Sequence, residues 1–320
     1  MQDDTRTTDR GILVLGAGEL GMCVLRQLAR LAATPNGTRV TVLLRPSTLE
    51  SNESSKKASI DELRALGIEC LPGDLMSASI SELSALFAGF DTVVSCIGFA
   101  AGKGTQVKLT RAAIEAGVRR FVPWQFGVDY DVIGRGSAQD LFDEQLDVRD
   151  ILRGQERTEW LIVSTGMFTS FLFEPVFGVV NLAENTVNAL GSWDTAVTVT
   201  TPEDIGLLTA EILFAKPRLK NQVVYTAGDT LTYGELADKV DKALGRDVLR
   251  VEWSVAKLNA DLAFDSDDAI KKYRAVFAQG KGVAWDKSCT FNHQQHFEVM
   301  DVERWMRLNL VHLPLWSKVL

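Results

Sequence analysis

The sequence predicts an α/β fold built on a doubly wound parallel sheet. Three observations carry this prediction: short apolar runs alternate with amphipathic stretches through the first half of the chain, a glycine-rich turn follows the first apolar run, and the alternation stops beyond Gly166. Strict alternation of strand and helix favours parallel strands joined by right-handed crossovers. Ligands of such sheets bind at the carboxyl ends of the strands, so the loops after strands are the candidate site.

Each expected strand of the first half is a short aliphatic run, and each expected helix has apolar residues three and four positions apart. In chain order the elements are strand 11–15, helix 19–33, strand 39–44, helix 59–66, strand 68–71, helix 80–87, strand 92–96, helix 106–116, strand 119–122, helix 139–152 and strand 160–163. We therefore assign residues 9–165 to a first α/β domain.

In the second half of the chain, expected strands and helices no longer alternate regularly. An aromatic segment covers 168–177, strands are expected at 195–200, 223–226 and 248–253, and helices at 202–214, 231–244, 255–263 and 301–308. A capping box, Thr232 with Glu235, marks the start of one of these helices. No linker rich in Gly, Ser or Pro separates the halves. We expect residues 166–320 to form a smaller α+β substrate-binding lobe, closely packed on the first domain and partly intertwined with it.

Composition argues against several functional classes. The chain has 320 residues with 34 Lys+Arg and 42 Asp+Glu, a formal charge of −8, and a sequence pI near 5.1, so nucleic acid is not an expected partner. No apolar run approaches the roughly 20 residues that span a bilayer. The polar residues 1–10 lack the apolar core of a signal peptide. We expect a cytoplasmic protein, monomeric or homodimeric, that binds a small molecule and neither a membrane nor nucleic acid.

Cysteine and histidine usage narrows the chemistry further. The four cysteines lie far apart without a CxxC pair, which indicates neither a disulfide framework nor a zinc site. The three histidines, His293, His296 and His312, all fall in the last thirty residues, which removes most Ser-His and Cys-His nucleophile schemes. His293 and His296 have HxxH spacing but no third ligand nearby, so no metal is expected.

The turn after the first strand predicts a dinucleotide site. It reads Gly-Ala-Gly-Glu-Leu-Gly and leads directly into the first helix. In this context Gly16 makes the tight turn, Gly18 lets a pyrophosphate approach the backbone, and Gly21 allows the helix to pack closely on the strand. The helix N-terminus at Glu19 and Leu20 stabilises negative charge. The fold class is therefore a Rossmann-type doubly wound parallel sheet, and a turn needed for geometry alone is the weaker alternative.

The end of the second strand selects the nucleotide. NAD sites usually place Asp or Glu there to bind the ribose hydroxyls, whereas a 2′-phosphate needs a cation. This chain has Arg45 there and no carboxylate until Glu50. Arg45 offers a planar fork for a phosphate, and Lys56 or Lys57 supplies a second charge from the following loop. Solvated surface residues are the alternative for all three. The predicted cofactor is NADP(H), and residues 9–165 are therefore assigned as the NADP-binding domain.

One common proton-transfer device is missing. Many doubly wound NADP enzymes use a Tyr with a Lys four residues later, the lysine lowering the tyrosine pKa. The residues four positions after Tyr130, Tyr225, Tyr233 and Tyr273 are Gly134, Asp229, Ala237 and Phe277. A reductase built on this chain therefore needs another proton donor.

Four stretches together resemble a known family. They are Val-Leu-Gly-Ala-Gly-Glu-Leu-Gly at 14–21, Arg-Pro at 45–46, Ala-Ile-Glu-Ala-Gly-Val-Arg-Arg-Phe-Val-Pro-Trp-Gln-Phe-Gly-Val-Asp at 113–129, and Phe-Asp-Glu-Gln-Leu-Asp-Val-Arg at 142–149. They resemble the NmrA-like branch of the atypical short-chain dehydrogenases, which includes the isoflavone and phenylcoumaran benzylic ether reductases, and are most similar to its fungal members. The resemblance covers about residues 11–215.

The resemblance implies a lysine where this chain has Gln145. A Phe-x-x-Lys-x-x-x-Arg signature in those reductases supplies a lysine taken as the general acid/base near the nicotinamide and an arginine that contacts the cofactor. Phe142 and Arg149 match that signature. Gln145 has no proton to exchange in the physiological range, although it can bind the nicotinamide ribose or orient a water. Proton transfer then falls to another residue, for which Tyr130 and Lys103 are the candidates, or to water.

The remaining site residues complete the prediction. The cofactor contacts are assigned to Cys96, Gln106, Gln125 and Arg149, and the substrate pocket to Phe126, Met167, Phe168 and Phe171. Aromatic residues at such spacing are also typical of an ordinary core. Three hypotheses follow: an NADPH-dependent reductase of a small lipophilic or aromatic secondary metabolite, an NADP(H)-binding regulator without turnover, and a redox-neutral isomerase or cyclase on the same scaffold.

Overall fold

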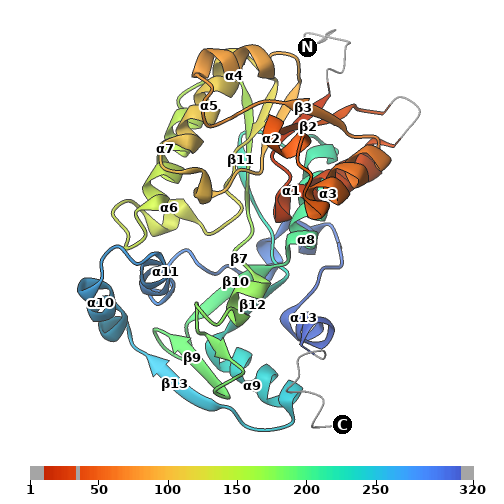
Figure 1. The fold of residues 1–320 in the computed structure, drawn as a ribbon. Coiled ribbons are helices and arrows are strands. Elements are labelled where there is room, and N and C mark those ends of the chain that lie inside the picture. Colours follow the sequence, from red (N-terminus) through yellow and green to blue (C-terminus); the bar gives the residue numbers. More distant parts are fainter. Residues whose placement is uncertain (1–10, 34–36, 311–320) are drawn as a thin grey trace. The chain divides into compact units, whose positions relative to one another are not determined.

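A computed structural model describes residues 11–33 and 37–310 of the chain (Figure 1). The polar N-terminal segment 1–10 and His312 lie outside the described residues. The chain divides into two compact units. The first comprises the described residues up to Trp124 with Asp147–Ile162 and Gly206–Val223, and the second comprises Gln125–Leu146, Val163–Ile205 and the described residues from Val224 onward. The chain therefore passes between the units five times.

A seven-stranded sheet forms the centre of the first unit, in the order β11-β6-β5-β4-β1-β2-β3. Its strands are β1 (Ile12–Leu15), β2 (Val40–Leu44), β3 (Glu69–Pro72), β4 (Thr92–Ser95), β5 (Arg120–Val122), β6 (Glu159–Ser164) and β11 (Gln222–Tyr225), of which the last two continue into the second unit. The neighbouring pairs from β3 to β6 are parallel. This arrangement confirms the Rossmann-type doubly wound sheet, whose strand order reverses direction between β1 and β4.

Helices cover both faces of this sheet (Figure 1). They are α1 (Glu19–Ala32), α3 (Ser54–Ala65) and α8 (Pro202–Phe214) on one face, and α4 (Ile80–Phe87), α5 (Thr105–Ala116) and α7 (Leu141–Arg153) on the other. Two ion pairs connect the first group: Arg26 with Glu62 at 2.5 Å and Arg30 with Glu211 at 2.8 Å. The second group packs on a continuous core that includes Leu13, Leu15, Phe87, Leu109, Phe121 and Leu152. Alternation along β1 explains this core, because every second strand side chain faces the same helices.

The first half follows the sequence prediction closely. Helix α4 has the predicted bounds, but the helix expected at 59–66 begins at Ser54. Its first turns are exposed, and apolar periodicity starts only at Ile60, so the pattern shows the buried part of the helix and misses the solvated part. The short helices α2 (Pro46–Leu49) and η1 (Phe99–Ala101), which were not predicted, occupy loops after β2 and β4.

Two three-stranded sheets organise the second unit, in the orders β12-β10-β7 and β13-β9-β8. The strands are β7 (Met167–Phe168), β8 (Val180–Asn181), β9 (Thr186–Leu190), β10 (Ala196–Thr200), β12 (Asp229–Thr232) and β13 (Leu249–Trp253). The helices are α6 (Tyr130–Ile133), α9 (Tyr233–Leu244), α10 (Val255–Phe264), α11 (Ala269–Phe277), α12 (Phe291–Gln294) and α13 (Val302–Asn309), and the 3₁₀ turns are η2 (Thr169–Phe173) and η3 (Lys287–Cys289).

Predictions for this unit were less complete. The capping box of Thr232 and Glu235 is present, and α9 begins one residue after it, because Leu231 belongs to β12. Strand β9 and helix α11 were not predicted. The aromatic segment proves to be strand β7 followed by η2. Within the described ranges, no helix has the length and apolarity needed to cross a membrane.

Candidate functional site

A cavity of about 650 Å³ lies in the first unit, at the carboxyl ends of β1, β2, β3 and β4. Its walls come from the loops after these strands and from the start of α3, and the lining residues are Gly16, Ala17, Gly18, Leu43, Leu44, Arg45, Thr48, Ser55, Lys56, Ser59, Ile60, Leu63, Gly73, Asp74, Leu75, Met76, Cys96, Ile97, Gly98, Ala100 and Ala101. The cavity therefore occupies the position where open α/β sheets bind ligands, beside the reversal of strand order.

The floor of the cavity is the glycine turn between β1 and α1. Gly16 has φ +87°, a conformation that favours glycine. A Cβ on Gly21 would collide with the carbonyl oxygen of Gly16, so the third glycine is required for the helix to pack against the turn. At Gly18, by contrast, a Cβ would meet no atom within 4 Å. This open space beside the first turn of α1 leaves the backbone accessible to a ligand.

The rim of the cavity carries two cations and one anion. Arg45 is exposed at the N-terminal end of α2, and Lys56 pairs with Glu53 at 2.7 Å in the first turns of α3. Lys56 thus lies on a helix, where the sequence suggested a loop. Asp74 follows β3 and accepts hydrogen bonds from the Met76 N–H at 2.9 Å and the Ser77 hydroxyl at 2.8 Å, which hold the pKa of Asp74 below its usual value.

Five of the predicted cofactor residues line this cavity: Gly16, Gly18, Arg45, Lys56 and Cys96. Burial raises the pKa of Cys96 to about 12, so its thiol stays protonated and acts as a packing group. Polar liners such as Thr48, Ser59 and Asp74 were not predicted. They belong to no motif, and only their place after a strand or at the start of α3 would have indicated them.

Other predicted cofactor residues lie outside the lining of this cavity. Gln106 is buried in α5 and donates from Nε2 to the Ile97 carbonyl at 2.7 Å, so it supports the loop that carries Ile97. Arg149 is fully buried on α7. Lys103, a candidate proton donor, is exposed in the turn before α5. Glu19 is exposed and Leu20 buried in the first turn of α1.

Gln145 lies in the second unit and has an unusual environment. Its side chain is completely buried, and neither its Nε2 nor its Oε1 has a hydrogen-bond partner among the described residues. The buried Gln125 donates from its own Nε2 to the main-chain carbonyl of Gln145 at 2.8 Å, so this contact does not involve the Gln145 side chain. An unpaired buried polar group costs about 1–3 kcal/mol. A side chain kept at that cost is a candidate ligand-binding group.

Aromatic rings surround the start of the same helix. Tyr130 is 2% exposed and contacts Phe142 edge to face, with ring centroids 5.0 Å apart. Phe142 in turn contacts Tyr273 at 5.9 Å, and Tyr273 contacts Phe171 at 6.4 Å. Burial raises the pKa of Tyr273 to about 12. Tyr273 was not predicted, because α11 was not recognised. The cluster joins a candidate proton donor, Tyr130, to one predicted substrate residue, Phe171.

The other predicted substrate residues are also largely buried. Phe126 and Met167 are 5% and 8% exposed, and Phe168 is half-buried.

A polar contact involves Asp129, the residue before Tyr130: the Tyr225 hydroxyl donates a hydrogen bond to Asp129 Oδ2 at 2.6 Å. Asp129 also caps α6. This pair was not predicted.

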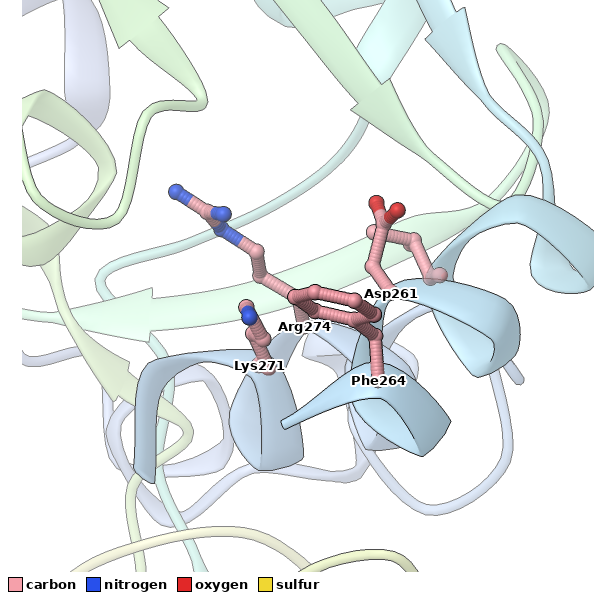
Figure 2. Close-up of a pocket in the computed structure, with 5 residues that line it drawn as sticks. Asp261, Phe264, Lys271 and Arg274 are labelled. Atoms are coloured by element: carbon pink, nitrogen blue, oxygen red, sulfur yellow. The ribbon is translucent and has the colours of Figure 1, made fainter. Parts of the chain in front are cut away.

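A smaller cavity of about 130 Å³ lies between α10 and α11 (Figure 2). Its polar groups already have partners. Asp261 pairs with Lys257 at 2.6 Å, and Lys271 with Asp265 at 3.4 Å. Arg274 donates to two main-chain carbonyls. With Asp261 and Lys271 in ion pairs and Nε and Nη2 of Arg274 engaged, the cavity offers little to attract a charged ligand, and we assign it no function. Across the described part of the chain, no group of three His, Cys, Asp or Glu side chains is placed to hold a metal ion.

The model of the NmrA-like family matches residues 8–306 of this chain. The chain belongs to the NmrA-like family. An NmrA-like family domain-containing oxidoreductase of Gibberella moniliformis is 49% identical to it over 302 residues, covering 94% of this chain and 98% of that protein. The resemblance inferred from the sequence motifs is thereby confirmed.

Solved structures with the same fold include reductases. A crystal structure of an isoflavone reductase has a TM-score of 0.78 at 20% identity, covering 94% of this chain and 99% of the other. The binary complex of leucoanthocyanidin reductase with NADPH from Vitis vinifera has a TM-score of 0.75 at 18% identity, covering 94% and 99% respectively. At such identities these structures establish the shared fold of this NmrA-like protein.

Proposed function

We propose that this NmrA-like protein is an NADPH-dependent oxidoreductase that reduces a small lipophilic or aromatic secondary metabolite. The observation that carries the proposal is the cavity at the carboxyl ends of β1–β4, with a glycine turn as its floor and Arg45 and Lys56 at its rim. Membership of the NmrA-like family supports it, as does a 49% identical relative that is named as an oxidoreductase. The cofactor assignment is further supported by the NADPH bound to leucoanthocyanidin reductase.

The residues of the cavity fit a phosphorylated dinucleotide. Gly18 leaves open space at the N-terminus of α1, where backbone N–H groups and the helix dipole stabilise a pyrophosphate. Arg45, whose guanidinium can bind a phosphate, would contact the 2′-phosphate, and Lys56 would add a point charge from α3. The apolar liners Leu43, Ile60 and others offer a wall for a flat base. When bound, NADPH supplies the hydride.

Gln145 is proposed as a ligand-orienting residue. Its amide can donate through Nε2 and accept through Oε1, and both atoms are buried and unpaired among the described residues. A substrate or cofactor group that pairs with both atoms would recover the lost hydrogen-bond energy. Because an amide cannot exchange a proton near neutral pH, the proton is assigned to Tyr130, to Lys103 or to water.

A second function is favoured by the same residue. Glutamine in the place of the family lysine fits a protein that binds NADP(H) without turnover, as a regulator, or that catalyses a redox-neutral isomerisation or cyclisation. The regulator and the reductase make the same prediction for nucleotide binding and opposite predictions for turnover.

Nucleotide titration tests the cofactor assignment. NADPH, NADP+ and NADH are titrated into the purified full chain, with binding followed by calorimetry. We expect the two phosphorylated nucleotides to bind at least tenfold more tightly than NADH, since a charge-assisted phosphate contact is worth about 1.5–3 kcal/mol. Equal affinity for NADPH and NADH would contradict the assignment of Arg45.

A turnover screen separates the two functions. NADPH oxidation is measured with phenolic and enone substrates for the wild type and for Gln145→Lys. Turnover by the wild type supports the reductase, and an increase in Gln145→Lys indicates that the proton supply limits the rate. Nucleotide binding with no turnover by either protein favours the regulator or the redox-neutral enzyme.

A further inference from the structure

Strand β13 is the outer strand of the sheet β13-β9-β8 in the second unit. It runs parallel to β9, and the two strands are connected by a hydrogen bond from the Leu249 N–H to the Asn185 carbonyl at 2.8 Å and one from the Gly191 N–H to the Trp253 carbonyl at 2.9 Å. Backbone groups of successive residues point to opposite sides of a strand. The N–H and C=O groups of Arg250 and Glu252 therefore point away from β9, and no other described strand pairs with them.

The sequence of this edge is complementary to itself. In an antiparallel pair of two β13 strands centred on Val251, Arg250 of each copy lies opposite Glu252 of the other. Leu249 likewise lies opposite Trp253. Opposite charges and apolar pairs directly across an antiparallel ladder are both stabilising. Two ion pairs and two apolar pairs thus arise from one strand of five residues.

The hydrogen-bond register agrees with this charge pattern. Arg250 and Glu252 are the residues whose backbone groups point outward, so each Arg250–Glu252 pair exchanges two backbone hydrogen bonds and the two pairs together make four. Val251 then falls on the two-fold axis, between the bonded pairs. A centre one residue to either side keeps the same set of backbone groups facing each other, but places two Arg250 or two Glu252 residues directly opposite each other. The backbone therefore allows the register centred on Val251, and the charges favour it over its neighbours.

The side chains at this edge are accessible. Arg250 and Glu252 are exposed, and Leu249 is 62% exposed. Arg250 reaches Asp238 at 2.6 Å and Asp241 at 2.5 Å, in both cases through Nη2. A guanidinium has five donors, so these contacts hold the group beside the strand and leave other donors for a carboxylate. Exposed edges usually carry charges that oppose pairing; here the two signs alternate so that they favour it.

We propose that β13 pairs antiparallel with β13 of a second copy of this chain, joining two three-stranded sheets into one of six strands. The occupant of the edge is a second copy because the complementarity is two-fold symmetric, as an isologous interface requires. A five-residue strand pair is small beside the roughly 1,000 Å² of a stable interface, so the dimer forms reversibly and its population depends on concentration.

Charge variants test the pairing directly. The mass of the full chain is measured by sedimentation over a wide concentration range for the wild type, Glu252→Arg and Arg250→Glu. Each variant alone places like charges opposite each other twice, and we expect its dimerisation to weaken at least tenfold. An equimolar mixture of the two variants restores both opposite-charge pairs, so a heterodimer forms with about the wild-type affinity. Failure of the mixture to associate while the wild type dimerises would place the interface elsewhere.

A cysteine pair tests the register. In a Cys289→Ser background, which removes an exposed thiol, Val251→Cys places two thiols across the two-fold axis within disulfide reach. Leu249→Cys is the matched control, because its two copies lie about 13 Å apart in the proposed register. We expect mild oxidation to cross-link Val251→Cys and not Leu249→Cys. Equal cross-linking of both, a wild type that stays monomeric at every concentration, or a stable complex of this edge with a different protein overturns the proposal.

Discussion

The cavity at the carboxyl ends of β1–β4 in the first unit and the surroundings of Gln145 in the second unit are built in opposite ways. In the cavity, the backbone of a glycine turn forms the floor, and the polar rim is already hydrogen-bonded or solvated. Around Gln145, a single side chain is enclosed with both amide atoms unpaired among the described residues. The first site depends on the absence of side chains, and the second depends on the identity of one side chain.

This difference has an energetic consequence. A backbone-built site adds little strain to the unliganded protein, whereas a buried unpaired amide lowers its stability until a partner arrives. Substitutions of the glycines in the first region should therefore change binding by steric exclusion. Apolar substitutions at Gln145 should raise the stability of the protein and lower its activity or ligand affinity.

The glycine turn should give the largest effect. Gly21→Ala forces a Cβ against the Gly16 carbonyl, and we expect about 2–3 kcal/mol of destabilisation together with loss of nucleotide binding. Gly18→Ala is the matched variant, because its Cβ meets open space. We expect unchanged stability but at least tenfold weaker NADPH binding. Chemical denaturation and calorimetry measure the two quantities, and equal destabilisation by both variants would refute the distinction between the two glycines.

Gln145→Met should stabilise the protein, whereas Gly21→Ala destabilises it. Methionine has a similar length and no group that needs a hydrogen bond, so we expect the free energy of unfolding to rise by about 1–2 kcal/mol while turnover or ligand affinity falls. Urea denaturation of the ligand-free protein measures the first change. A loss of stability in this variant would mean that the amide has a partner in the unliganded protein.

Arg45→Ala should change selectivity and leave stability unaffected. Removing the guanidinium should weaken NADPH roughly tenfold and NADH much less, because only NADPH carries the 2′-phosphate. Arg64→Ala is the control: Arg64 is exposed on α3, pairs with Asp61 at 3.4 Å and does not line the cavity. Comparable losses for both nucleotides in Arg45→Ala would show that Arg45 does not contact the phosphate.

The smallest effect is expected at Asp74 and depends on pH. Hydrogen bonds from Met76 and Ser77 hold the pKa of Asp74 below its usual value. A carboxyl whose folded pKa is lowered contributes stability above its unfolded pKa and loses that contribution as pH falls through the folded value. Asp74→Asn should therefore reduce the stability difference between neutral and acidic pH. Thermal unfolding between about pH 6 and 3 measures this, and parallel curves would exclude the contribution.

The sequence identified the parts of the molecule that are specified locally. The strand and helix alternation of the first half and the GxGxxG turn depend on short-range periodicity and on glycine sterics, and both are found in the structure. Arg45 was located because its place at the end of β2 follows from strand topology. Strand β9 was missed since Thr186–Leu190 is buried without alternation and, unlike β1, is not an aliphatic run, because Thr186 and Asn188 interrupt it.

The properties of Gln145 depend on the tertiary structure. Its type and position are visible in the sequence, but its complete burial and its unpaired amide atoms arise only in the folded chain. Asp74 and Thr48 reach the cavity in the same way, because loops without a motif converge there only in the folded chain. Tyr273 joins the aromatic cluster through α11, a helix whose N-cap, Asp268, was not recognised as a start signal in the sequence.

The interleaving of the two units has a consequence during synthesis. Every residue that lines the cavity of the first unit has been synthesised once Ala101 is added, yet α8 and β11 are made only at residues 202–225. Gly206 of α8 packs against the backbone of Cys23 in α1. This surface of α1 therefore stays uncovered until about 180 further residues have been translated. A nascent chain that stops at residue 165 would carry the whole pocket and an exposed apolar face, which makes such fragments natural substrates for chaperones.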